Sequence, residues 1–280
     1  ARATDASKLQ GIDLSTPLTE RLNKMVASSG LNKNDLGLWV GAKTHEGLAT
    51  VFAHNSDTLF IPASLSKVIT AGAILSKLQP THKFKTQLLS SASLSAGTLK
   101  GSLYLKGGGD PGFVSENMWV LVNDLTRTGV RTIEGDVVVD DTRFDKVRFG
   151  EDRESVRVDR AYDAPIGAMS FNWNSVNVYI RPGEKVGDPL QVTADPINGF
   201  IKLKNETKTV GGGRGKSVEV ERITEKDQDI IRVQGSMALG HEEVVVYKSN
   251  SQTDLWAGAN LIEFLKQRGI QVKGVVKKKK

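Results

Sequence analysis

Ser64 and Lys67 are the residues whose types and spacing most readily support chemistry. They open the segment "FIPASLSKVITAGAILSKL" (60–78), whose apolar residues recur at helical spacing. Residues three apart share one face of a helix, so the amine can reach the hydroxyl. The start of a helix also favours an anion and offers free amides. The pair is therefore a candidate nucleophile and base, and the alternative is a helix cap beside a solvated lysine.

Two glycine-rich segments imitate nucleotide-binding motifs. The segment 210–220, "VGGGRGKSVEV", lacks the first glycine of a P-loop and continues as an alternating strand, so we expect a flexible hairpin loop. The segment 103–113, "LYLKGGGDPGF", fits G-x-G-x-x-G, with Asp140 or Asp141 as the ribose-binding acid. Against dinucleotide binding, that acid lies too far along the chain, Pro111 stiffens the loop, and the neighbouring strands look antiparallel.

Composition excludes several other classes of site. The chain has no cysteine, which excludes disulfides, thiolate zinc sites and cysteine catalysis. Its four histidines are scattered without zinc-binding spacing, and G-x-S-x-G is absent, so we expect no metal and no cofactor. No apolar run is long enough to span a membrane. We expect no signal peptide in a chain that begins "ARATDASKLQ", which fits either a cytosolic protein or one matured by cleavage.

The net charge of +6 is weaker evidence for a nucleic-acid-binding surface than its size suggests. Four of these charges are Lys277–Lys280, which leaves +2 for the rest of the chain. We therefore expect no nucleic-acid surface. We expect the lysine run to be a solvated, unstructured end or a remnant of cloning.

The elements that position Ser64 and Lys67 lie in the first part of the chain. We expect a helix at 16–29, with Thr16 as its cap and Pro17 at its first position, and strands at 36–42 and 48–54. The helix that begins at Ser64 ends before Pro80.

The sequence changes character after about residue 80. Short alternating segments then follow one another to about residue 250, and they predict a largely β region. Two helices interrupt or close it, at 115–129 and 254–269. We therefore place a domain boundary near residue 80.

The segment "PASLSKVITAGAIL" resembles the active-site helix of the penicillin-recognising serine enzymes. Other segments narrow the resemblance to the low-molecular-mass class C penicillin-binding proteins, the D-alanyl-D-alanine carboxypeptidases and endopeptidases of the penicillin-binding protein 4 type (peptidase family S13). These segments are "GTLKGSLYLKGGGDPGF", "GVRTIEGDVVVDDTRFD", "YDAPIGAMSFNWNSVNV", "VQGSMALG" and "AGANLIEFLKQRGIQVKG". The resemblance extends from about residue 16 to about residue 275.

The resemblance implies an α+β fold. Residues 1–80 would be the N-terminal part of a transpeptidase-like catalytic domain, of the serine β-lactamase fold. Residues 81–280 would be a β-rich accessory region inserted into that domain. The rest of the catalytic domain would follow residue 280 and would be a partner of this chain.

The resemblance also implies an activity. Ser64 would attack the D-Ala-D-Ala carbonyl of a peptidoglycan stem peptide, or a D-Ala-diaminopimelate cross-link, and Lys67 would take its proton. The backbone N–H of Ser64 would supply one oxyanion-hole donor. β-Lactams would acylate the same serine, and the compartment would be the periplasm.

Two further elements of the family pattern are not recognisable. No Lys-Thr-Gly occurs in the chain, and the Ser-x-Asn matches, at 115–117, 170–172 and 175–177, fall in segments that resemble the insertion. Structure alone explains the last two, and no catalytic role is assigned to the three. The alternative function is therefore a non-catalytic, wall-binding or partner-binding fragment of the same fold.

The insertion in this family often holds the amino-acid end of diaminopimelate with a tryptophan and an aspartate. The corresponding segment here, "FGEDRESVRVDRA", has no tryptophan. Asp159 is the candidate substrate-binding residue, Asp152 and Glu154 compete with it, and a solvated acidic loop is the alternative.

Overall fold

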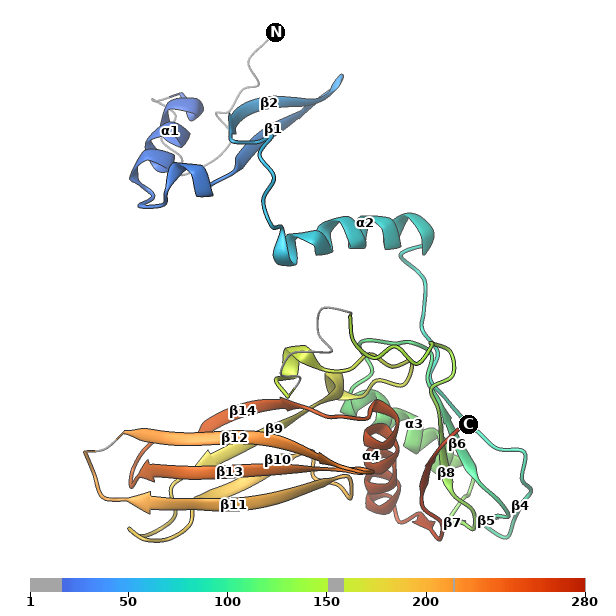
Figure 1. Cartoon of the computed structure of the whole chain (residues 1–280). Helices are drawn as coiled ribbons and strands as arrows, with labels where there is room; N and C mark the ends of the chain where they lie inside the picture. The colour runs from blue at the N-terminus through green and yellow to red at the C-terminus, as the bar shows by residue number, and fades with distance from the viewer. Residues whose placement is uncertain (1–16, 151–158, 214, 280) are drawn as a thin grey trace. The chain divides into compact units, whose positions relative to one another are not determined.

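The chain divides after His82 into two units, Ala1–His82 and Lys83–Lys280. The computed structural model describes residues 17–150, 159–213 and 215–279 (Figure 1). The division lies next to the boundary predicted near residue 80. The assignment of the first unit to a catalytic domain stays a prediction.

The first unit contains the predicted helices and the predicted strand pair. Its elements are α1 (Leu18–Ser28), η2 (Lys33–Asp35), β1 (Leu38–Thr44), β2 (Gly47–His54), η3 (Ala63–Leu65) and α2 (Ser66–Lys77). Pro17 precedes the first residue of α1, and the predicted cap Thr16 lies outside the described residues.

The strands β1 and β2 form an antiparallel hairpin from Leu38 opposite His54 to Thr44 opposite Gly47. Just beyond the hairpin, the side-chain amide of Asn55 donates hydrogen bonds to the backbone carbonyls of Lys33, at 2.6 Å, and Leu36, at 3.1 Å. These bonds tie the end of β2 to the segment that leads into β1.

The second unit begins with two small sheets. One has the order β16–β8–β6–β3 and the other the order β15–β7–β5–β4. Their strands are β3 (Gln87–Leu89), β4 (Leu94–Ser95), β5 (Thr98–Leu99), β6 (Leu103–Lys106), β7 (Thr132–Ile133), β8 (Val137–Asp140), β15 (Gln271–Val272) and β16 (Val276–Lys278). The predicted helices are confirmed as α3 (Ser115–Arg127) and α4 (Thr253–Gln267).

The expectation of antiparallel strands around the glycine run is confirmed for β3, which pairs with β6 antiparallel, and is wrong for β8. β6 pairs in parallel with β8, since the chain crosses between them through α3. The glycines nevertheless serve packing: a side chain at Gly107 would meet the Ala168 carbonyl oxygen at 2.4 Å. The amides of Gly107 and Gly109 donate to the carbonyls of Asp140 and Ala168, so these two amides are not free to bind a phosphate.

The rest of the second unit contains two three-stranded sheets with the orders β10–β9–β14 and β11–β13–β12. Their strands are β9 (Ser175–Arg181), β10 (Gln191–Asp195), β11 (Ile201–Val210), β12 (Lys216–Glu225), β13 (Gln228–Ala238) and β14 (Val244–Ser249). The hairpin expected at the glycine-rich loop 211–215 is wrong, because β13 lies between β11 and β12. Lys216 and Ser217 belong to β12, as the alternating sequence indicates.

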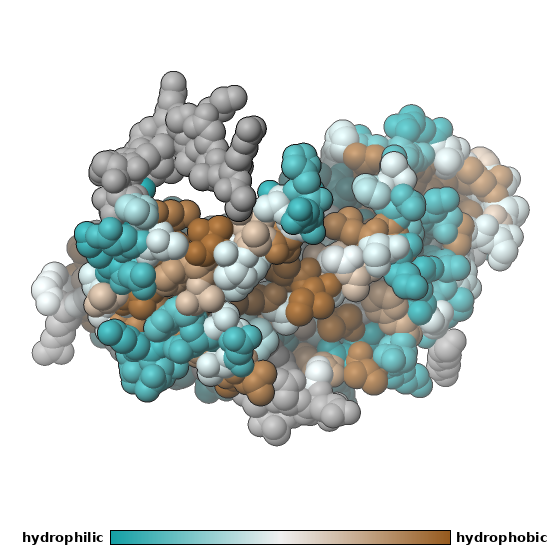
Figure 2. Space-filling view, turned by 90° about the horizontal axis from the view of Figure 1, so that it is seen from above, coloured by the Kyte–Doolittle hydropathy of each residue, from teal (hydrophilic) through white to brown (hydrophobic). Residues whose placement is uncertain are grey.

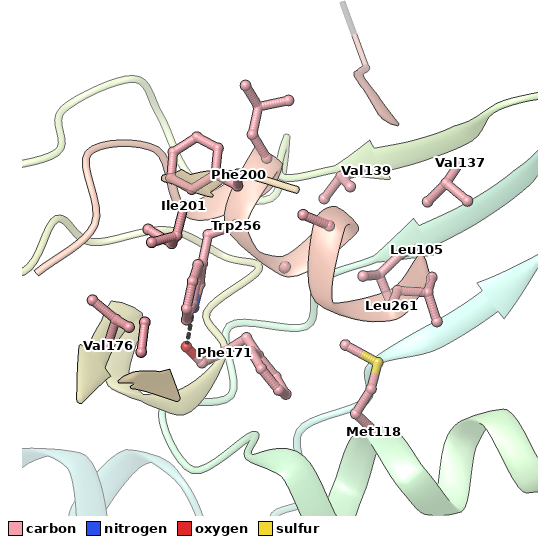
Figure 3. Close-up of a cluster of buried hydrophobic side chains, with 14 of the residues drawn as sticks. Leu105, Met118, Val137, Val139, Phe171, Val176, Phe200, Ile201, Trp256 and Leu261 are labelled. Carbon is pink, nitrogen blue, oxygen red and sulfur yellow. Dashed lines mark hydrogen bonds between the residues drawn. The ribbon is translucent and has the colours of Figure 1, made fainter. Parts of the chain in front are cut away.

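Trp256 on α4 joins these parts into one hydrophobic core. Its side chain is fully buried, and its indole N–H donates to the Phe171 carbonyl at 2.9 Å (Figure 3). The rings of Phe171 and Phe200 pack on either side, each with its centroid 6.4 Å from that of Trp256. Leu105, on β6, belongs to the same cluster. Burial of such large side chains is the main stabilising contribution to the second unit.

The lysine run at the end of the chain is ordered, so the expectation of an unstructured end is wrong for Lys277–Lys279. β16 pairs in parallel with β8. Lys277 binds Asp136 at 2.6 Å, Lys278 binds Asp254 at 3.4 Å, and Lys279 binds Asp140 at 2.8 Å. These aspartates are distant from the lysines in the sequence, so the lysine run alone could not predict the ion pairs. Lys280 lies outside the described residues.

Candidate active site

The local fold places Ser64 in a tight turn at the beginning of an apolar helix. Pro62 precedes the 3₁₀ turn η3, whose Ala63 and Ser64 carbonyls accept from the Ser66 amide where α2 begins. Ala63, directly before the serine, has a φ of +43°, a left-handed conformation that is costly for a residue with a side chain. Such strained positions concentrate at functional sites, so this turn is a candidate for one.

Lys67 lies one turn further along and contacts the serine directly. Its Nζ is 2.8 Å from Ser64 Oγ, within hydrogen-bond distance. Both side chains are exposed. The predicted proximity of hydroxyl and amine is therefore present in the structure. Their catalytic roles stay a prediction.

The arrangement has the parts of a two-residue nucleophile. A neutral amine at this distance can accept the hydroxyl proton while the oxygen attacks a carbonyl carbon. Ser66, also in this turn, is engaged differently, because its hydroxyl donates to the Ala63 carbonyl at 2.8 Å. The geometry thus distinguishes Ser64 from its neighbour as the serine in contact with the amine.

Asp159, the candidate substrate-binding residue, lies in the second unit and is buried. Lys248 Nζ donates to its carboxylate at 2.7 Å, and both side chains are less than one-tenth exposed. The two charges hold the chain before η4 (Ala161–Asp163) against β14, where Arg160 bridges to Lys248. This environment gives Asp159 a structural role, and its contact with a substrate stays a prediction. Asp152 and Glu154 lie outside the described residues.

The Ser-x-Asn matches have structural roles. Asn172 accepts from the Ser115 amide at 2.9 Å and donates to its hydroxyl at 3.0 Å, which fastens the turn η5 (Asn172–Asn174) to the start of α3. Asn117 accepts from the Val114 amide, and Asn177 lies within β9. The structure therefore uses Ser115, Asn117 and Asn172 for packing and capping.

The acids considered for ribose binding also have partners within the protein. Asp140 accepts from the Thr142 hydroxyl and binds Lys279, while Asp141 accepts from the Met169 amide. Burial raises the pKa of Asp141, although its hydrogen bond with Met169 opposes the rise. Neither carboxylate is available as the dinucleotide hypothesis requires.

Among the residues that the structure describes, no group of three histidines, aspartates or glutamates is placed to hold a metal ion. Within the same part of the chain, no helix combines the length and apolar character needed to cross a bilayer.

Solved structures show the class of fold. The chain matches penicillin-binding protein 4 of Haemophilus influenzae with a TM-score of 0.69 and 19% identity, over 89% of this chain and 56% of that one. The same protein in complex with a β-lactam matches with a TM-score of 0.63 and 20% identity, over 90% of this chain and 53% of that one. The α+β fold of penicillin-binding protein 4, predicted from the sequence, is thereby confirmed.

Sequence comparison shows the family. Residues 18–280 match the D-Ala-D-Ala carboxypeptidase 3 (S13) family, and the chain belongs to that family. It is 28% identical over 232 residues to a D-alanyl-D-alanine carboxypeptidase of Actinomadura sp. (strain R39), over 81% of this chain and 43% of the relative. It is 22% identical over 264 residues to DacB of Haemophilus influenzae, over 94% of this chain and 52% of the relative. The chain thus spans about half the length of these curated relatives.

Proposed function

We propose that this chain is the N-terminal portion of a peptidoglycan DD-peptidase that acts through an acyl-enzyme on Ser64. The observation that carries the proposal is the 2.8 Å contact between Lys67 Nζ and Ser64 Oγ in a chain of the S13 family. Its substrates are stem peptides that end in D-Ala-D-Ala, with D-Ala-diaminopimelate cross-links as a second class. Because peptidoglycan lies outside the cytoplasmic membrane, the proposal includes a periplasmic location.

The proposed reaction has two halves. The neutral amine of Lys67 accepts the Ser64 hydroxyl proton while Oγ attacks the carbonyl carbon of the penultimate D-Ala. The Ser64 N–H stabilises the oxyanion, the amine of the terminal residue leaves with a proton, and an ester on Ser64 remains. Water then attacks the ester, which restores the hydroxyl and releases the shortened peptide. A β-lactam follows the first half by opening its ring on the same oxygen.

The surface of α2 supports the view that further chain completes this site. Val68 and Ile69 are 72% and 79% exposed, and apolar side chains are visible on the face shown in Figure 2. Uncovered apolar surface of this kind usually meets another protein segment. We propose that a C-terminal remainder, bearing the Ser-x-Asn and Lys-Thr-Gly elements, covers α2 and faces Ser64.

Labelling with a fluorescent penicillin tests the proposal. Full-length protein, with the remainder present, should label covalently, and Ser64→Ala should abolish the label. Lys67→Ala should slow acylation by about 10²–10⁴-fold, since it removes the proposed base. The matched control is Ser66→Ala, which removes a hydroxyl from the same turn and should keep the label.

The same experiment separates the proposal from a non-catalytic alternative. No Lys-Thr-Gly occurs in this chain and no catalytic role is assigned to its Ser-x-Asn matches, which favours a wall-binding or partner-binding fragment as the second candidate. If the completed wild-type protein does not label, or if Ser64→Ala labels as wild type does, the enzyme proposal is wrong.

A further inference from the structure

The two three-stranded sheets of the second unit have contrasting outer faces. In the β10–β9–β14 sheet, one set of alternate positions lies in the core, including Val176, Val178 and Ile180. The other set faces outward because successive side chains of a strand alternate. The outward positions are Ser175, Asn177, Tyr179 and Arg181 on β9, Gln191, Thr193 and Asp195 on β10, and Val245 and Tyr247 on β14. We call this set the tyrosine face.

The strand register places the two tyrosines beside each other. Tyr247 pairs with Asn177, and Tyr179 pairs with Val245. The tyrosines are therefore diagonal neighbours across β9 and β14, a separation that aromatic side chains can span. On the other side of Tyr179 lies Thr193. Tyr247 is 56% exposed, so at least one ring presents most of its surface to solvent.

The tyrosine face carries little net charge. Arg181 donates from its Nε to the Gln191 side chain at 2.8 Å, so its guanidinium is held by a neighbour on the same face. Asp195 is the carboxylate of the face, beside Asn177 in the register. The remaining side chains are hydroxyls, amides and one valine. Such a surface offers donors and acceptors for hydroxyl and amide groups without a field that favours a polyanion.

The outer face of the β11–β13–β12 sheet differs in composition from the tyrosine face, although both are outer faces of three-stranded sheets. On the outer face of β11–β13–β12, Arg232 binds Glu221 at 2.6 Å and Gln234 donates to Glu219 at 2.8 Å. That face carries many charged side chains, and the outward positions of its three strands include no aromatic residue. Of the two outer sheet faces compared, the tyrosine face is therefore the one that carries aromatic residues.

We infer that the tyrosine face binds a glycan, a linear polymer of N-acetylated hexoses. The flat apolar rings of Tyr179 and Tyr247 can stack on the C–H faces of sugar rings, while their hydroxyls reach water. Asn177, Thr193 and Asp195 lie beside them to bind hydroxyl and acetamido groups. The choice of the peptidoglycan glycan strand as the polymer rests on the proposed function. The face would hold the polymer while stem peptides are presented for cleavage.

Binding to glycan strands freed of their stem peptides tests the inference. Full-length wild-type protein should be retained on an insoluble preparation of these strands. The Tyr179→Val/Tyr247→Val variant, which keeps β-branched residues in both strands, should bind at least fivefold more weakly. The matched control, Trp119→Ala, removes a 52% exposed aromatic residue from α3 and should bind as wild type does.

A second variant and a second measurement distinguish loss of glycan binding from misfolding and from failure of the proposed function. Thr193→Glu changes an exposed position and leaves the core intact, and it should also weaken retention. Both variants should label with fluorescent penicillin as wild type does. Wild-type protein that is not retained, or variants that are retained equally, would overturn the glycan inference. Loss of penicillin labelling in wild type with glycan retention intact would overturn only the proposed activity.

Discussion

Two lysines of this chain show how burial and partner decide the role of a residue. Lys67 is exposed and donates a hydrogen bond to the Ser64 hydroxyl, so its partners are solvent and the candidate nucleophile. Lys248 is buried and contacts the Asp159 carboxylate, so both charges depend on each other. The first pair could be predicted because i and i+3 are neighbours on any helix. The second could not, since its members are 89 residues apart.

The buried pair gives a prediction about stability. Asp159→Ala leaves Lys248 as a buried charge without this partner, and we expect a loss of about 3–5 kcal/mol in the free energy of unfolding. Urea denaturation followed by circular dichroism measures it. The control Asp124→Ala removes an exposed carboxylate that pairs with Arg127 on α3, and it should cost less than about 1 kcal/mol.

Two outcomes would bear on the role of Asp159. Asp159→Ala/Lys248→Met removes both charges and should recover most of the loss. A loss below about 1 kcal/mol for Asp159→Ala alone would contradict the structural role. Asp159 would then again be open to a role in substrate binding.

At the scale of elements, the sequence predicts the long, regular parts and misses the short ones. The helices at 115–129 and 254–269 were predictable from spacing, and β9, β11, β12, β13 and β14 from alternation. The two-residue strands β4, β5 and β15 carry too few residues for a pattern. Their pairing depends on contacts between distant segments.

The conformation of the turn η5 also could not be predicted from the sequence. Asn172, Trp173 and Asn174 have φ values of 46°, 53° and 52°, so three successive residues are left-handed. Asparagine tolerates this conformation, but tryptophan does so at a cost. The cost is offset by bonds from distant groups: Asn172 contacts Ser115, and Asn174 donates to the Pro165 carbonyl at 2.9 Å. No local pattern marks such a turn.

The terminal strand β16 gives a prediction about pH. Burial raises the pKa of Asp140, but hydrogen bonds from Lys279 and Thr142 outweigh it, so the pKa is lowered overall. A lowered pKa stabilises the fold above the unfolded value of 3.8, and this stabilisation is lost as the pH falls through the folded value. Lys279→Met should therefore cost about 1 kcal/mol at pH 7, and the difference from wild type should shrink below pH 3.8.

The control for this prediction is another lysine near the end of the chain. Lys273→Met removes a lysine that is 61% exposed and lies 3.8 Å from Glu134, so it should change stability little at either pH. Urea denaturation at a series of pH values compares the three proteins. An effect of Lys279→Met that is independent of pH would show that lost packing, not the ion pair, is responsible.

At the scale of the whole molecule, the two units differ in how well they cover their apolar side chains. The second unit contains a continuous core that includes Trp256, Phe171 and Leu261. Among the described residues of the first unit, the buried apolar side chains are Val26 and Phe52. The first unit thus has little core of its own, in keeping with the proposal that a further segment completes it.

Hydrogen exchange of two helices of similar length tests this contrast. α2 has 12 residues and α3 has 13, but α3 buries Met118 and Val122 whereas α2 buries no side chain. Helices of this length are marginal in water without tertiary packing, and the β-branched residues and glycine of α2 weaken it further. In the present chain, the amides of α2 should exchange at least 100-fold faster than those of α3. Adding the proposed remainder should bring α2 to the protection of α3, whereas equal protection of both helices in the present chain would contradict the proposal.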